Sequence, residues 1–228
     1  MKQPGTAVRL ALGRAVAGFA LLAAVAASCR SLAPQAAPEW KSLFDGKTLD
    51  GWKVTDFGGQ GEVRVEDGQI ILDFGSADLT GVTWTGDVPR MDYEVSLEAM
   101  RVDGYDFFCG LTFPVKDSCC SLIVGGWGGS LVGISSFDDM DASENETTEY
   151  MEFENGRWYR IRLRVTEGRI EAWIDDTQVI DAQPGDRKIS VRSEVDLSQP
   201  FGLAAWNTKA ALRDIRIRRL EPDSGGTE

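Results

Sequence analysis

The chain has 228 residues and a net charge of −12, and because its first 28 residues contribute +3, the remainder carries −15. A surface that negative repels phosphate backbones and anionic lipid, so it excludes nucleic acid as a partner and favours neutral sugars or cations. The chain contains no histidine, which excludes the usual zinc ligand sets and every nucleophilic triad built on histidine.

The N-terminus has the pattern of an export signal. A basic segment precedes an uncharged run, "AVAGFALLAAVAAS", that ends in small residues before Cys29. This run is shorter than the roughly 20 apolar residues of a membrane-spanning helix, so we expect residues 1–28 to be removed. "VAASC" resembles a bacterial lipobox, with Ala26 where leucine is usual, and this resemblance implies a lipid on Cys29. The alternative is an ordinary cleavage site beside a free cysteine.

The expected organisation follows from composition. Residues 29–39 are rich in Ala and Pro and predict a short extended tether. Residues 40–220 are then one β-sandwich domain, about the usual size for such a fold, and residues 221–228 are a tail. The resulting localisation is the bacterial cell envelope, as a lipoprotein in the periplasm or on the outer membrane, with lipid as the only membrane contact.

Three further cysteines, Cys109, Cys119 and Cys120, cannot all pair with one another. An exported protein meets an oxidising environment, so one bridge from Cys109 to Cys119 or to Cys120 is an open possibility. Adjacent cysteines rarely bridge because the geometry is strained.

Alternation of apolar and polar residues predicts strands along most of the chain after Trp40. The clearest cases are "YEVSLEAM", "RWYRIRLRVT", "RIEAWID" and "LRDIRIRRL". Weaker strand patterns occur in "EVRVE", "QIILDF", "DFFCGLTF", "CSLIVGG", "SLVGISS", "TQVIDA" and "FGLAAW". Asp67-Gly68 and Glu167-Gly168 mark hairpin turns. With no sustained helical period, the pattern indicates an all-β sandwich of antiparallel sheets.

Several stretches together resemble the 3-keto-disaccharide hydrolase family, formerly domain of unknown function 1080. They are "SLFDGKTLDGWK", "VEDGQI", "GRWYRIRLRV", "RIEAWIDDTQVID" and "LRDIRIRRL", and the resemblance spans Trp40 to Leu220. It implies a concanavalin A-like jelly roll and a hydrolase or lyase activity on 3-keto-glycosides. In such a reaction a base removes the acidic C2 proton while an electrophile stabilises the enolate.

The acidic stretch "GISSFDDMDASENETTEY" is a candidate site. Asp139, Asp141, Ser143 and Asn145 have the spacing of the first ligands of a calcium loop, but Glu144 stands at the position that requires glycine, which excludes an EF-hand. A looser oxygen site for a divalent cation such as calcium remains open; its ligands would be Asp138, Asp141 and Glu144, or Glu146. The alternative is a solvated loop.

Aromatic residues supply candidates for sugar stacking. Trp127 stands among four glycines in "SLIVGGWGGS", which would leave its ring exposed, and Trp206 is followed by Asn207, whose amide could bind hydroxyls. The alternatives are that Trp127 and Trp206 belong to the core and that Asn207 only ends a strand.

The strand "RVDGYDFFCGLTF" supplies further candidates. By resemblance it lines the concave face, so Asp106 and Thr112 would face the cleft and Arg101 would contact substrate. The E-x-D-x-x-E signature of laminarinase-type glycosidases is absent, which argues against that route. The candidate catalytic acids are Asp106, Asp141, Glu144 and Glu146. The alternative functions are a non-catalytic carbohydrate-binding domain and a cell-envelope interaction domain.

Overall fold

The computed structural model describes residues 39–221. The predicted signal segment, Cys29, nearly all of the tether and the last seven residues lie outside this range. None of the helical segments between residues 39 and 221 is long and apolar enough to cross a membrane.

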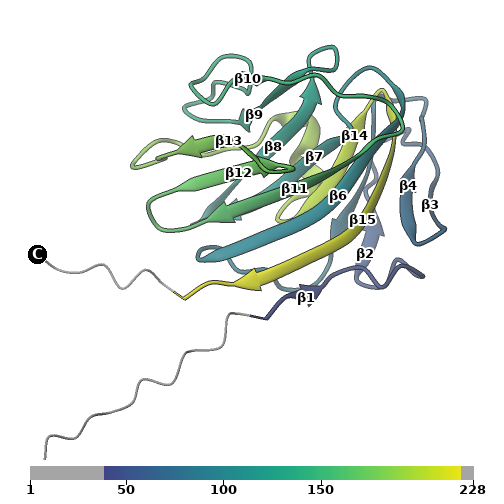
Figure 1. Cartoon of the computed structure of the whole chain (residues 1–228), viewed down its shortest axis with the longest axis horizontal. Helices are drawn as coiled ribbons and strands as arrows, with labels where there is room; N and C mark the ends of the chain where they lie inside the picture. Colours follow the sequence, from purple (N-terminus) through teal and green to yellow (C-terminus); the bar gives the residue numbers. More distant parts are fainter. Residues whose placement is uncertain (1–38, 222–228) are drawn as a thin grey trace, which may run out of the picture. The chain divides into compact units, whose positions relative to one another are not determined.

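Two antiparallel sheets form the domain (Figure 1). Sheet A has the order β13-β12-β11-β6-β15-β4-β3, with β1 also paired to β15. Its strands are β13 (Thr177–Ala182), β12 (Ile170–Ile174), β11 (Trp158–Val165), β6 (Tyr93–Gly104), β15 (Thr208–Arg219), β4 (Gln69–Leu72), β3 (Val63–Glu66) and β1 (Lys41–Ser42). Sheet B has the order β10-β9-β8-β7-β14-β5-β2. Its strands are β10 (Glu149–Tyr150), β9 (Leu131–Ser135), β8 (Ser118–Gly126), β7 (Cys109–Val115), β14 (Gly202–Trp206), β5 (Leu79–Trp84) and β2 (Trp52–Val54).

The all-β prediction is confirmed, and each strand predicted from alternation is present. In β11, Ile161, Leu163 and Val165 are buried between the sheets, whereas the intervening arginines point outward. The β3–β4 hairpin turns through Asp67 and Gly68, both with positive φ, as a two-residue turn of this type requires. The strand β5 was not predicted, and its residues, LTGVTW, are nearly all buried without a clear alternation.

The main core lies between the two sheets. It is built from the inward-facing apolar residues of both, and its largest fully buried side chains include Tyr93, Tyr159, Phe108 and Phe113. The hydroxyl of Tyr93 donates to the carbonyl of Pro114 at 2.6 Å, so this buried phenol is satisfied.

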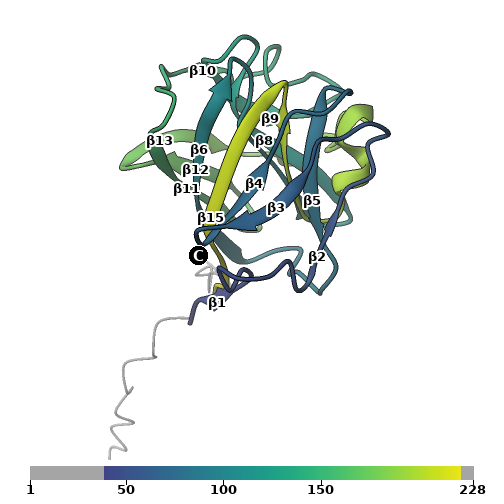
Figure 2. The same ribbon diagram turned by 90° about the vertical axis from the view of Figure 1, so that its right-hand side faces the viewer.

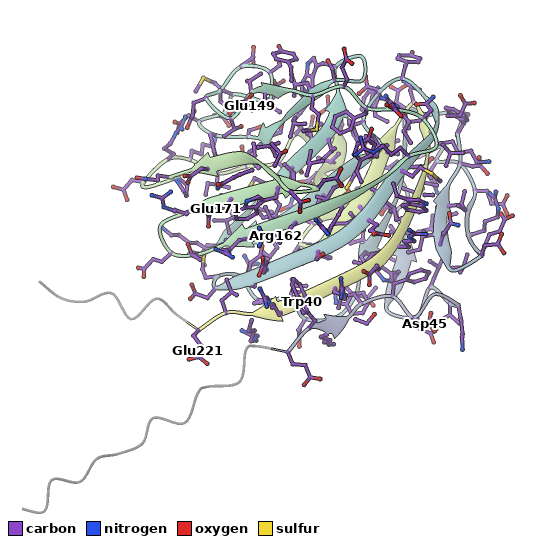
Figure 3. All side chains as sticks on the ribbon, viewed as in Figure 1. Trp40, Asp45, Glu149, Arg162, Glu171 and Glu221 are labelled. Atoms are coloured by element: carbon purple, nitrogen blue, oxygen red, sulfur yellow. The ribbon has the colours of Figure 1, made fainter. Side chains whose placement is uncertain are left out.

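The outer face of sheet A carries oppositely charged side chains on neighbouring strands. Glu94 of β6 lies between β11 and β15, and its side chain is fully buried beneath arginines from both strands. It accepts hydrogen bonds from Arg162 at 3.0 Å and from Arg218 at 2.8 Å. The ring of Trp173 lies 3.8 Å from the Arg162 guanidinium carbon. Figure 3 labels Trp40, Arg162 and Glu171 on this face.

The disulfide that the sequence left open does not form. Cys109, Cys119 and Cys120 are free and buried. Cys109 pairs with Val124 in the ladder, whereas Cys120 stands four residues away along β8, or about 13 Å, far beyond the reach of a disulfide. Burial raises the pKa of the Cys109 thiol to about 12, so this thiol is unreactive at neutral pH.

The outer face of sheet B carries mostly small side chains. One cross-strand row runs through Gly133, Ile123, Gly110, Ala204 and Gly81, from β9 to β5. The next row consists of Ser135, Ser121, Thr112, Gly202 and Thr83.

Without bulky residues in these rows, another layer of chain can lie directly on the sheet. The segment 183–201, here called the strap, connects β13 to β14 across this face and contains the short 3-10 helix η1 (Ser193–Ser198). Figure 2 shows its coil on the side of sheet B that faces away from sheet A. A second, smaller core, which includes Phe107, Ile123 and Val195, forms beneath the strap.

Replacing Glu94 by Gln should destabilise the domain by about 2–4 kcal/mol, because partly buried arginines would lose the charge that compensates them. The measurement is the free energy of unfolding from urea denaturation. As a control, Glu66→Gln removes an exposed partner of Arg64 and should cost less than about 1 kcal/mol. Equal losses for the two variants would contradict the role assigned to Glu94.

Candidate functional site

A pocket of about 190 Å³ opens where the strap meets the turn between β8 and β9. Its lining comes from the β6–β7 connection, β8 with the turn that follows it, β9, the strap and β14, and it combines aromatic rings with charged groups. The residues that matter most for its chemistry are Asp106, Phe107, Trp127, Arg192, Glu194 and Trp206.

Trp127 is presented by a tight glycine turn. It has φ +48, and Gly128 and Gly129 follow with φ +89 and +110, so the chain reverses between β8 and β9 within a few residues. The tryptophan side chain cannot fold back into the sheet from this turn and is 43% exposed. The exposed ring predicted from the surrounding glycines is therefore present, and it borders the pocket.

Trp206, at the end of β14, forms a second aromatic wall. Its ring packs against Phe107 with centroids 6.2 Å apart and planes tilted by 44°, and its backbone N–H donates to the Phe107 carbonyl at 3.0 Å. Trp206 remains partly exposed. Two tryptophan faces thus border one pocket, an arrangement suited to the apolar faces of a sugar ring.

Arg192 of the strap is held in place by carboxylates on two sides. Its guanidinium donates to Asp141 at 2.6 Å and to Glu194 at 2.8 Å. Its central carbon lies 5.9 Å from the centre of the Trp127 ring. The hydrogen bond to Glu194 raises the pKa of Arg192, so its positive charge is permanent. The pocket therefore contains a fixed cation.

Glu194 is correspondingly locked as an anion. The hydrogen bond from Arg192, assisted by backbone N–H donation, lowers the pKa of this carboxyl to about 2. A carboxylate so strongly stabilised in its charged form is a weak base.

Lowering the pH should leave the Arg192–Glu194 pair intact until pH values near 2. The folded pKa lies below the unfolded value of about 4.3, so the pair stabilises the fold above that value and this contribution disappears as the pH falls toward 2. An NMR titration of the Glu194 carboxyl should give a midpoint near 2, and Arg192→Met should raise it. A midpoint near 4.5 in the unmodified protein would contradict the ion pair.

Asp106 is the carboxylate of the pocket that forms no salt bridge within residues 39–221. Its oxygens accept hydrogen bonds from the backbone N–H groups of Phe107 at 2.7 Å and Gly128 at 3.3 Å. Its own N–H donates to the buried Thr208 hydroxyl at 3.1 Å, which fixes the backbone between β6 and β7. The sequence prediction that Asp106 faces the cleft agrees with this position.

The other predicted catalytic acids lie outside the pocket lining. Asp141 reaches the pocket only through Arg192. Glu144 is exposed, and Glu146 is an exposed partner of Arg187. These positions correct the expectation that Asp141, Glu144 and Glu146 converge with Asp106.

The acidic loop instead binds the strap. Asp138 accepts a hydrogen bond from Arg187 of the strap at 2.8 Å, and Asp139 accepts one from Lys188 at 2.8 Å. The Arg187 hydrogen bond lowers the pKa of Asp138. Each of these acids thus faces a basic residue.

The predicted cation site does not form. Asp138, Asp141 and Glu144 were its expected ligands, yet no group of three or more acids or cysteines within residues 39–221 is arranged to hold a metal ion. The carboxylates of Asp138 and Asp141 are directed toward arginines instead.

Arg101, Asn207 and Thr112 also take positions other than those expected. Arg101 is 7% exposed and points to a neighbouring hollow. Asn207 adopts φ +43 between β14 and β15 and binds Asp78, so it shapes the turn. Thr112 does face outward from sheet B, but it is buried there and hydrogen bonded to Ser121 at 2.8 Å.

Arg192 and Glu194 were missed because the strap has no strand or helix period. One signal could have indicated them. The long connection between two predicted strands contains three basic residues, Arg187, Lys188 and Arg192. Their positive charges are opposite to the negative charges of the acidic run at Asp138–Glu146.

Two antiparallel sheets with an aromatic pocket on one outer face define a concanavalin A-like sandwich of the carbohydrate-active class. Residues 39–218 match the family described as the 3-keto-alpha-glucoside-1,2-lyase-like domain, and the chain belongs to that family. The resemblance found in the sequence is therefore confirmed. No curated protein is significantly similar in sequence.

Solved structures with the same fold are distant in sequence. A Crh5 transglycosylase has a TM-score of 0.56 at 14% identity, over 82% of this chain and 86% of that one. A Bacillus subtilis protein of unknown function with a galectin-like fold has a TM-score of 0.56 at 9% identity, over 79% and 98%. A candidate glycosyl hydrolase from Parabacteroides distasonis has a TM-score of 0.51 at 13% identity, over 80% and 94%. These likenesses support the fold.

Proposed function

We propose that this protein cleaves 3-keto-glycosides, with the oxidised sugar ring bound between Trp127 and Trp206. The observation that carries the proposal is that one carboxylate without a salt bridge in the described residues, Asp106, and one fixed guanidinium, Arg192, line the same aromatic pocket. Family membership supports this class of substrate.

The reaction needs a base and a positive charge. The base removes the proton from C2, and the electron pair of that C–H bond moves into the C2–C3 bond, so that the C3 carbonyl becomes an enolate. The enolate then re-forms the carbonyl as the C1–O bond breaks, and the leaving oxygen takes a proton. Addition of water across the new C1–C2 double bond completes hydrolysis, whereas release before that addition gives a lyase.

Asp106 is the better base of the two pocket carboxylates. Glu194 is committed to Arg192 and would lose that hydrogen bond on accepting a proton. Asp106 holds only backbone N–H groups, which orient the carboxylate and leave it able to accept a proton.

Arg192 is suited to stabilise the enolate. Its geometry is fixed before substrate binds, because Asp141 and Glu194 hold the guanidinium from two sides. Preorganised charge of this kind is effective because no reorganisation is needed as the negative charge develops. Asp141 therefore contributes through Arg192.

We also propose that the protein acts outside the cytoplasm, in the bacterial cell envelope, held by lipid at Cys29. This part rests on the sequence pattern of residues 1–29. A chain that begins at residue 30 should consequently be suitable for assays in solution.

Asp106→Asn should lower kcat on 3-keto-trehalose or 3-keto-sucrose by about 10²–10⁴, because the amide cannot accept the C2 proton. Release of monosaccharide is measured with and without calcium. Asp139→Asn is the matched control, since Asp139 is an exposed acid outside the pocket, and it should keep full activity.

Absence of release from the unmodified chain under all conditions would overturn the enzymatic proposal. Binding of the same sugars without release would favour a carbohydrate-binding domain instead, since that function needs only the two exposed tryptophan faces.

Trp127→Ala should weaken binding of the keto-glycoside about tenfold, equivalent to about 1.4 kcal/mol, through loss of the stacking surface. Trp127→Phe should give an intermediate Kd. The control is Tyr150→Ala, because Tyr150 is 71% exposed and does not line the pocket. Calorimetric Kd values that are equal for Trp127→Ala and Tyr150→Ala would contradict sugar stacking at Trp127.

A further inference from the structure

A second hollow lies directly behind the Trp127 turn. It is open, has a volume of about 470 Å³, and its polar and aromatic lining includes Arg101, Tyr105, Gly128, Glu152 and Asn155. None of its lining residues belongs to the first pocket, so the hollow is a distinct feature of the surface.

One thin wall separates the two hollows. On one strand connection, Tyr105 lines the second hollow and the next residue, Asp106, lines the first. In the turn, Trp127 lines the first and Gly128 lines the second. The two parts of the wall are joined by the hydrogen bond from the Gly128 N–H to Asp106 at 3.3 Å. At both places, neighbouring residues of the chain therefore line different hollows.

Arg101 makes the second hollow a fixed structure. It is 7% exposed, and its guanidinium donates to Asn155 at 2.7 Å, to the Phe153 carbonyl at 2.6 Å and to the Gly129 carbonyl at 3.2 Å. Opposite sides of the hollow are thereby tied together.

Gly129 is required at this point. Its φ is +110, and a side chain there would lie 2.9 Å from the Arg101 guanidinium and 2.9 Å from the Tyr105 carbonyl. The sequence "WGG" therefore both exposes Trp127 and lets the turn close over Arg101.

The groups left available in this hollow suit a neutral polyol. Tyr105 is 66% exposed and offers a ring face and a hydroxyl. Glu152 and Glu154 are exposed acceptors. Arg101 keeps its positive charge because its three acceptors are neutral, but it is buried and its guanidinium donors are occupied. The exposed charges of the lining are therefore the carboxylates of Glu152 and Glu154. An anionic group would be repelled there.

We propose that the second hollow binds the leaving group of the glycoside, and that this group is a neutral sugar unit. The inference rests on the proposed function. It places the scissile bond over the wall, beside Asp106, where a proton-transferring carboxylate must lie. The substrate would bridge both hollows across Trp127.

The test compares two substrates that differ only in the leaving group, 3-keto-trehalose and methyl 3-keto-glucoside. Tyr105→Ala should raise KM for the disaccharide roughly five- to tenfold, the loss expected for truncating one contact residue, and should leave KM for the methyl glycoside unchanged. Tyr150→Ala is the control and should affect neither. Equal effects of Tyr105→Ala on both substrates, or no effect on either, would overturn the proposal.

Charge selectivity gives a second readout. A 3-keto-glucoside whose leaving group is a uronic acid should bind more weakly than 3-keto-trehalose, and Glu152→Lys should reduce this discrimination. Equal affinities in the unmodified protein, or discrimination that Glu152→Lys leaves unchanged, would contradict an acid-lined subsite.

A binding experiment separates failure of this inference from failure of the enzymatic proposal. Calorimetry with unoxidised trehalose and glucose requires no turnover. If the chain releases no sugar from any substrate, the enzymatic proposal fails, yet Tyr105→Ala should still lower the ratio of trehalose to glucose affinity. An unchanged ratio, or no measurable binding of trehalose, would overturn the second subsite.

Discussion

The small side chains on the outer face of sheet B are the constraint on which the site depends. Glycine, alanine, serine and threonine at these positions leave room for a third layer of chain directly on the sheet. Gly133 is packed so closely under the acidic loop that an added Cβ would lie 2.8 Å from the Ala142 carbonyl, and Gly202 is equally close to Ser198 of the strap. Larger residues would lift both segments and remove Arg192 and Glu194 from the pocket. The pocket therefore depends on the small side chains at these positions of sheet B.

Charge determines how that layer is held. The strap contains three acids and three basic residues, so its net charge is zero, and the basic ones are Arg187, Lys188 and Arg192. The acidic loop supplies a counter-charge to each of these three basic residues. Because Asp138 and Asp141 are directed toward arginines, the acids of this loop do not converge, within residues 39–221, into a group that could hold a metal ion. Asp106 differs because backbone N–H groups alone orient it. The acids of the loop thus have a structural role, whereas Asp106 is suited to accept a proton. The difference lies in their hydrogen-bond partners, which are basic side chains for the loop acids and backbone N–H groups for Asp106.

The sequence was sufficient for the fold but only for part of the site. Strand alternation predicted most of sheet A, because one buried face imposes a period of two. The strands β7, β8, β9 and β14 of sheet B were predicted from apolar runs with weaker alternation, since they are buried on both faces. Three of the predicted site residues, Trp127, Trp206 and Asp106, line the pocket. The glycines around Trp127 indicated that its ring is exposed, whereas Asp106 was predicted from the family resemblance. Arg192 could not be placed, because it lies in a connection without periodicity and binds Asp141, 51 residues away. Arg101 was expected to contact substrate because it lies on a strand predicted to line the cleft. In the structure its guanidinium donors already bind Asn155, Gly129 and Phe153.

The strap also decides which part of a glycan can be reached. Thr112, Ser121 and Ser135 would form the floor of an open groove in a bare sandwich, but here they are at most 1% exposed. A polysaccharide laid across the strands would therefore meet the strap and not these hydroxyls. Under the function that we propose, the pocket beside the Trp127 turn would receive a terminal sugar unit or a short glycoside.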